Sequence, residues 1–292
     1  MVRQGPAKPP SLSSNLSATY VVNPLLYIIS TPIGHLDDCS KRALDTLALC
    51  DAILCEDTRR SSILLERYGL KKKLISYHAF KEKKALDPIL RDLEAGKTLG
   101  LISDAGTPCI NDPGLILVQA CIERGLSFTA IPGPCSLIQA LVLSGMDTTR
   151  FQFLGFLPRK PEATLRAALG YPGTSIAFES PERLVESLGI LSELDSGRRV
   201  AVAREMTKTF EECRRGTAAE LFRHFTEAAP RGEIVLLIAG GKAPEEEMPL
   251  EELVELLQMV HGLSLKEAIE MAAKCKNVPK RTVYNTIHSS KN

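Results

Sequence analysis

The chain has 292 residues, of which 44 % are hydrophobic and 24 % are charged. This is the composition of a folded globular protein, and it excludes disordered, collagen-like and coiled-coil chains. At roughly 150 residues per domain, the length predicts about two domains. The 36 lysines and arginines balance 35 aspartates and glutamates, so the formal net charge is +1. Bulk charge therefore gives no sign of a polyanionic partner, which would have to meet a local basic patch.

The eight cysteines predict neither disulfides nor a metal site. No two of them have the C-x-x-C spacing, and most stand in apolar runs, where a free thiol behaves as a small hydrophobic group. Reduced cysteines favour the cytoplasm. No run approaches about 18 consecutive apolar residues, so we expect no contact with a membrane interior. Residues 1–22, rich in serine and proline, predict a disordered extension, with an organellar targeting segment as the alternative.

From residue 25, short apolar runs alternate with amphipathic stretches. This pattern is typical of buried parallel strands joined by crossover helices, and it predicts an α/β domain over residues 23–147. Gly69, Gly96 and Gly125 each follow a helical stretch, where a left-handed residue often ends a helix. The expected strands are residues 25–30, 52–55, 74–77, 98–103 and 127–131.

The alternation of apolar runs and amphipathic stretches changes after Gly145, and the new pattern predicts a second α/β domain over residues 148–242. Ser180 and Pro181 indicate one helix start, and Thr217 with Glu220 forms a capping box at another. A glycine- and proline-containing linker follows at residues 240–244. The expected strands are residues 151–156, 174–178, 199–204 and 233–239.

Residues 245–292 contain helical patterns only, and they predict a small helical domain that resembles a helix-turn-helix. Ser264 and Glu267 form a second capping box. Basic residues, including Lys280 and Arg281, outnumber acidic ones after Ser264. They form either a solvated helix face or a phosphate-contacting patch, and composition does not decide between the two.

Ligands of an open α/β sheet bind beyond the carboxyl ends of its strands, so the loops at those ends are the places to search. Residues 31–36 carry neither a G-x-G-x-x-G fingerprint nor a phosphate loop, which argues against nicotinamide cofactors and nucleoside triphosphates. The loop at residues 104–114 has two glycines and two prolines. Its small residues allow close backbone approach, and Asp104 suits an amino or hydroxyl group of a ligand, whereas Asp112 is expected to cap the next helix.

A charged segment, Glu56-Asp57-Thr58-Arg59-Arg60, follows the second strand. It is either a surface turn, in which Asp57 or Thr58 caps the next helix, or a site where carboxylates orient a hydroxyl and guanidiniums hold a phosphate. After the fifth strand, Ser136 can cap a helix and also face a ligand. His35 and His78 stand isolated, and no hydrolase triad is legible.

Several of these segments together resemble the bacterial 16S ribosomal RNA (cytidine-2′-O)-methyltransferases, which belong to the tetrapyrrole-methylase superfamily. The resemblance spans residues 25–240 and departs modestly at His35, Cys109 and Cys135. It implies a two-domain fold with a mainly parallel first sheet, a mixed second sheet and a helical appendage. The matching segments are LYIISTPIG at residues 26–34, CEDTR at 55–59, ISDAGTP at 102–108, DPG at 112–114, IPGP at 131–134, GFLPRK at 155–160, FESPER at 178–183, AREMTK at 203–208 and RGE at 231–233.

The resemblance implies that S-adenosylmethionine binds between the two α/β domains. Its implied contacts are Pro32, Ile33, Asp104, Ala105, Thr107, Ser136, Phe178, Ala203 and Gly232. The implied reaction transfers a methyl group to the ribose 2′-hydroxyl of a cytidine in the decoding centre of the 30S subunit, and the superfamily suggests a homodimer.

From their place at a strand end, Glu56 and Asp57 are candidates for orienting the hydroxyl. The basic residues expected on RNA are Arg59, Arg60, Arg159, Lys160, Lys280 and Arg281. Two alternatives stay open: a methyltransferase acting on a tetrapyrrole, and a non-catalytic RNA-binding assembly protein.

Overall fold

The computed structural model describes residues 24–78, 82–241, 250–261, 263–276 and 278–289. The predicted extension at residues 1–22 and most of the predicted linker lie outside these ranges. The chain divides into two compact units, Met1–Ser136 and Leu137–Asn292. This division falls after Ser136, the first residue of helix α5 (Ser136–Ser144), whereas the expected domain boundary at residue 147 follows that helix.

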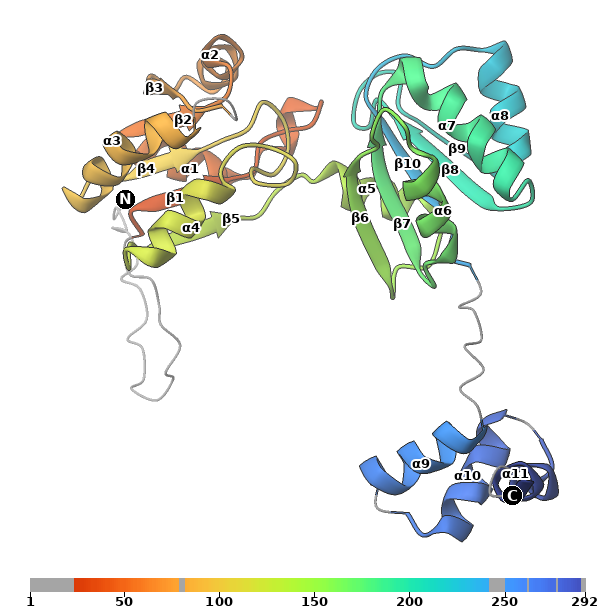
Figure 1. Ribbon diagram of the computed structural model, residues 1–292. Coiled ribbons are helices and arrows are strands. Elements are labelled where there is room, and N and C mark those ends of the chain that lie inside the picture. The colour runs from red at the N-terminus through yellow and green to blue at the C-terminus, as the bar shows by residue number, and fades with distance from the viewer. Residues whose placement is uncertain (1–23, 79–81, 242–249, 262, 277, 290–292) are drawn as a thin grey trace, which may run out of the picture. The chain divides into compact units, whose positions relative to one another are not determined.

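The first unit is built on a five-stranded sheet in the order β3-β2-β4-β1-β5, in which every neighbouring pair is parallel (Figure 1). The five expected strands are therefore confirmed. They are β1 (Leu26–Ile29), β2 (Ala52–Cys55), β3 (Lys73–Ser76), β4 (Leu99–Leu101) and β5 (Phe128–Ile131).

Helices cover both faces of this sheet. On one face lie α1 (Lys41–Leu49) and α2 (Thr58–Arg67), and on the other lie α3 (Glu82–Glu94) and α4 (Leu115–Glu123). A short 3-10 helix, η1 (Leu36–Asp38), precedes α1. Because both sides of the sheet are buried, its central strands are continuous apolar runs, which is why the sequence revealed them.

The second unit has a mixed sheet in the order β6-β7-β10-β8-β9, as the resemblance implied. The β6–β7 pair is parallel and the other pairs are antiparallel. The strands are β6 (Phe151–Phe156), β7 (Thr174–Glu179), β8 (Arg199–Arg204), β9 (Glu212–Thr217) and β10 (Ile234–Ile238). The sequence pattern did not predict β9, because this edge strand, ECRRGT, is polar and largely exposed.

Three helices, α6 (Glu162–Gly170), α7 (Pro181–Leu194) and α8 (Ala218–Glu227), pack their apolar residues on one face of the second sheet. The predicted capping box of Thr217 and Glu220 is present at the start of α8. At edge strand β9, the Arg215 Nε donates to the carbonyl oxygen of Leu143 over 3.0 Å, which fixes the end of α5 against this strand.

The C-terminal residues form α9 (Leu250–His261), α10 (Leu265–Lys276) and α11 (Lys280–Ser289). The three helices enclose a small core that includes Val254, Ala272 and Val283. The second predicted capping box is also present, since Ser264 N donates to Glu267 Oε2 over 2.9 Å and Glu267 N donates to Ser264 Oγ over 3.4 Å.

Gly114, which ends the long loop after β4, is a position that only glycine suits. Its φ is 134°, and a Cβ there would lie 2.6 Å from both Cys109 Sγ and Leu101 Cδ2. We expect Gly114→Ala to lower the free energy of unfolding by about 3 kcal/mol through backbone strain and overpacking. Urea denaturation followed by circular dichroism measures the loss.

The matched control is Gly125→Ala, whose φ is 65° and whose Cβ would have nothing within 4 Å. It carries the strain of a left-handed backbone without the overlap, so we expect a loss of only about 1 kcal/mol. Equal losses in the two variants would show that the packing around Gly114 is looser than described.

Candidate active site

Because every strand of the first sheet is parallel, the loops that follow β1, β4 and β5 meet at one edge. Thr31 and Gly106 exchange backbone hydrogen bonds of 2.8 and 3.1 Å, which join the loops after β1 and β4. The Thr107 hydroxyl donates to the carbonyl oxygen of Pro134 over 3.0 Å and lies 3.1 Å from Ser30 Oγ. Since a hydroxyl has a single proton, Ser30 is the donor to Thr107. One threonine therefore connects three loops.

The same edge places five of the predicted cofactor contacts on neighbouring loops. Pro32 and Ile33 are buried after β1, whereas Ala105 is exposed in the loop after β4. Between Ala105 and Thr107, Gly106 has a φ of 78°, and a Cβ there would lie 3.2 Å from Ile33 Cγ2. Small residues at 105 and 106 thus leave the backbone accessible beside an apolar side chain.

A charged groove of about 480 Å³ lies at the ends of β2, β3 and β4. Its centre is Asp104, whose Oδ1 accepts from Asp57 N over 3.2 Å and whose Oδ2 accepts from Arg60 Nη1 over 3.2 Å. The carboxylate therefore ties the start of α2 to the loop after β4. The lining residues are Glu56, Asp57, Thr58, Arg59, Arg60, Ser76, His78 and Asp104.

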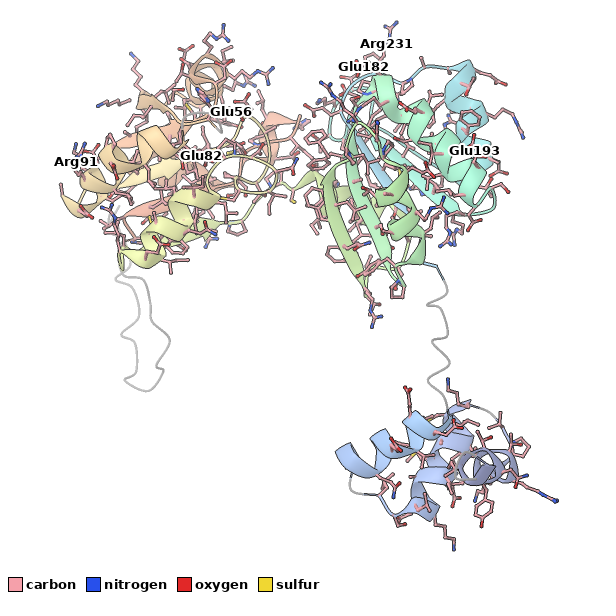
Figure 2. The ribbon with its side chains drawn as sticks, in the orientation of Figure 1. Glu56, Glu82, Arg91, Glu182, Glu193 and Arg231 are labelled. Atoms are coloured by element: carbon pink, nitrogen blue, oxygen red, sulfur yellow. The ribbon has the colours of Figure 1, made fainter. Side chains whose placement is uncertain are left out.

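Asp57 is the N-cap of α2, so the capping role that the sequence allowed for it is confirmed. Its Oδ1 accepts from Arg59 N over 2.8 Å and from Arg59 Nε over 3.2 Å, and its Oδ2 accepts from Arg59 Nη2 over 2.9 Å. These hydrogen bonds stabilise the anion and lower the pKa of the Asp57 carboxyl to about 2. Glu56, the other candidate for orienting a hydroxyl, lies at the end of β2 (Figure 2).

Asp112 does not cap α4, and the expectation that it would is wrong. Gly114 is the N-cap and has no side-chain cap, while the buried carboxylate of Glu82 accepts from Gly114 N over 2.8 Å (Figure 2). Asp112 is instead half-buried, beside the Ser103 hydroxyl and within electrostatic range of the Glu56 and Asp104 carboxylates. Burial, and secondarily the two nearby carboxylates, raise the pKa of Asp112 to about 6. In the sequence, Asp112 is followed by Pro113 and Gly114, and this local pattern gives no indication of the environment of Asp112.

In the second unit, three predicted cofactor contacts gather at one end of the sheet. Phe178 on β7 and Ala203 on β8 both pair with Val235 of β10, which lies between them. Gly232 precedes β10 and has a φ of 86°, and a Cβ there would overlap the Glu205 carboxylate, which follows β8. Antiparallel pairing therefore brings together residues that are distant in the sequence.

The residues predicted to contact RNA differ in their ion pairing. Arg59 and Arg60 have side chains that are 89 % and 72 % exposed, so their ion pairs are open to exchange. Arg159 and Lys160 are exposed after β6. Of the two residues on α11, Lys280 pairs with Glu270 of α10 over 2.6 Å, and Arg281 is exposed.

All eight cysteines are free thiols. Within the described residues, no group of three or more histidines, cysteines, aspartates or glutamates is arranged to hold a metal ion. No helix in this part of the chain has both the length and the apolar character needed to cross a membrane.

A family model described as Tetrapyrrole (Corrin/Porphyrin) Methylases matches residues 25–222. Ribosomal RNA small subunit methyltransferase I of Mesorhizobium japonicum is 41 % identical over 271 residues, covering 91 % of this chain and 92 % of that protein. The chain belongs to this methyltransferase family. Both the resemblance and the expectation of an enzyme are thereby confirmed, whereas the non-catalytic alternative loses its support.

Two further similar proteins match a smaller share of this chain. Ribosomal RNA small subunit methyltransferase I of Thermotoga maritima is 43 % identical over 217 residues, which are 98 % of that protein but only 74 % of this chain. The structure of a cobalt precorrin-4 methyltransferase has a TM-score of 0.56 at 18 % identity, covering 73 % of this chain and 94 % of that chain. The latter similarity shows a shared fold.

The raised pKa of Asp112 predicts a pH-dependent stability. Because the folded carboxyl, with a pKa of about 6 instead of 3.8, binds its proton more tightly than the unfolded one, this group makes folding less favourable as pH rises from about 4 to about 6. Asp112→Asn mimics the protonated acid. We therefore expect the free energy of unfolding of Asp112→Asn to equal that of the original chain at pH 4. At pH 7.5 the variant should be more stable by roughly 2 kcal/mol.

Thermal denaturation at several pH values measures this difference. Glu123→Gln, a change at an exposed carboxyl of α4, is the control and should leave the pH dependence unaltered. Parallel curves for Asp112→Asn and the original chain between pH 4 and pH 7.5 would contradict the buried, carboxylate-facing setting of Asp112.

Proposed function

We propose that this chain transfers the methyl group of S-adenosylmethionine to the ribose 2′-hydroxyl of a cytidine in the 16S ribosomal RNA of the 30S subunit. One observation carries the proposal: relatives named ribosomal RNA small subunit methyltransferase I are about 40 % identical over roughly nine-tenths of the chain. Action as a homodimer in the cytoplasm is part of the proposal, and it rests on the superfamily resemblance and the reduced cysteines.

The residues of the first unit fit the cofactor chemically. When bound, S-adenosylmethionine supplies a methyl group from a positively charged sulfonium. Asp104 offers a carboxylate to its amino or hydroxyl donors, the backbone at Ala105 is accessible, and Ile33 provides an apolar contact. The carboxylates of Glu56 and Asp112 add negative potential that suits a cation. The remaining cofactor contacts stay predictions, namely Pro32, Thr107, Ser136, Phe178, Ala203 and Gly232.

A ribose hydroxyl is a weak nucleophile, so catalysis depends on holding it about 3 Å from the methyl carbon. Glu56 is the better of the two candidate groups for this task. Asp57 caps α2, and its carboxylate accepts three hydrogen bonds from Arg59, which leaves it little capacity to orient a substrate. We therefore assign Asp57 the role of positioning Arg59, and Glu56 that of orienting the hydroxyl.

RNA binding is proposed to rest on local basic groups, because the net charge is only +1. Exposed ion pairs such as Arg60 with Asp104 contribute little stability, so the guanidinium can exchange its partner for a phosphate at low cost. Arg159, Lys160 and Arg281 present further exposed cations, whereas Arg59 pairs with Asp57 and Lys280 pairs with Glu270.

The deciding experiment adds methyl-labelled S-adenosylmethionine and the enzyme to 30S subunits that lack the modification, to naked 16S RNA, and to a precorrin-type tetrapyrrole. We expect label in the 30S subunits, recovered as 2′-O-methylcytidine after digestion to nucleosides and mass spectrometry. We also expect Glu56→Gln to lower kcat by at least about 10-fold, because the negative charge that orients the reacting hydroxyl is lost.

Exposed Glu66→Gln on α2 is the matched control and should leave kcat unchanged. Label in the tetrapyrrole alone would overturn the RNA substrate, and label on a base would overturn the 2′-hydroxyl. Normal turnover by Glu56→Gln, with cofactor binding intact, would remove Glu56 from its proposed role.

A further inference from the structure

The end of β3 places a histidine level with the charged end of β2. The two strands are parallel with Cys55 opposite Ser76, and Tyr77 N donates to the carbonyl oxygen of Cys55 over 2.8 Å, so the ladder continues past the strand. Side chains alternate between the two sides of such a chain. Tyr77 is fully buried, while Ser76 and His78 both line the charged groove.

Charged groups from two other segments line this groove together with His78. The end of β2 and the first turn of α2 supply Glu56, Asp57, Arg59 and Arg60, and the loop after β4 supplies Asp104. Glu56 and Asp104 also act electrostatically on Asp112, whose pKa burial and these two carboxylates raise. The groove therefore combines cations that can hold an RNA phosphate with a group of carboxylates.

Two of these carboxylates are already engaged by hydrogen-bond donors. Asp57 accepts three hydrogen bonds from Arg59, and Asp104 accepts from Asp57 N and from Arg60. A carboxylate stabilised as an anion in this way is a poor proton acceptor. Imidazole, by contrast, exchanges protons near neutral pH and is the commonest general base in enzymes.

We propose that His78 accepts the proton of the RNA hydroxyl that becomes methylated, an inference that rests on the proposed function. As the hydroxyl oxygen forms its bond to the methyl carbon, the bond from that carbon to sulfur breaks with its electron pair. The hydroxyl proton passes to the unprotonated imidazole nitrogen of His78, and solvent then removes it. Glu56, in the same groove, stabilises the imidazolium electrostatically.

The test measures single-turnover methylation of saturating 30S subunits between pH 5.5 and pH 8.5, together with 30S binding by filter retention. In the original chain the rate should fall on the acid side of this range. His78→Gln should lower the rate at pH 7.5 by about 100-fold and abolish that acid limb. Its affinities for 30S subunits and for S-adenosylmethionine, the latter measured by calorimetry, should change less than about threefold.

Chemical rescue separates a proton acceptor from a structural histidine. Adding free imidazole to His78→Ala should raise its rate in proportion to the unprotonated imidazole. His224→Ala, which removes a partly buried histidine of α8, is the control and should keep its rate with no response to imidazole.

An unaltered acid limb in His78→Gln, or an intact rate with weakened 30S binding, would overturn the proposal and leave the proposed function standing. The latter result would make His78 a phosphate contact. Failure of the original chain to label 30S subunits as 2′-O-methylcytidine would overturn the proposed function, and this proposal with it.

Discussion

The Thr107 hydroxyl is the interaction on which the candidate site depends. It donates to the carbonyl oxygen of Pro134 and accepts from Ser30, so one side chain contacts all three loops after β1, β4 and β5, beside the backbone bonds of Thr31 with Gly106. This contact is possible only because the strands are parallel and end at the same edge of the sheet. The exposed backbone at Ala105 and the carboxylate of Asp104 owe their positions to these linked loops.

Local pairing of opposite charges explains how a chain with a net charge of +1 presents a groove lined by charged residues. Arg60 and Asp57 N share the Asp104 carboxylate, and Arg59 folds back on Asp57. Each exposed pair contributes little to stability, so these guanidiniums remain available to a phosphate. The neutral total therefore reflects paired surface charges, and it limits long-range attraction of RNA without preventing contact.

The sequence predicted the parallel sheet well, because strands buried on both faces are continuous apolar runs that local pattern reveals. It did not predict β9, whose polar residues form an exposed edge. For a different reason, the sequence pattern indicated a wrong role for Asp112 and no role for His78. Their surroundings come from segments distant in the chain: Glu56 and Asp104 influence Asp112, and the pairing of β2 with β3 brings His78 level with the acidic segment. Only tertiary contacts decide such environments.

The central claim is that the loop after β4 holds the cofactor, and calorimetric titration with S-adenosylmethionine tests it most directly. Ala105→Phe places a ring over the accessible backbone of an exposed residue, and Ala95→Phe is a control at an exposed alanine that follows α3. We predict that Kd rises at least about tenfold in Ala105→Phe and is unchanged in Ala95→Phe. Equal affinity in both variants and the original chain would contradict the account.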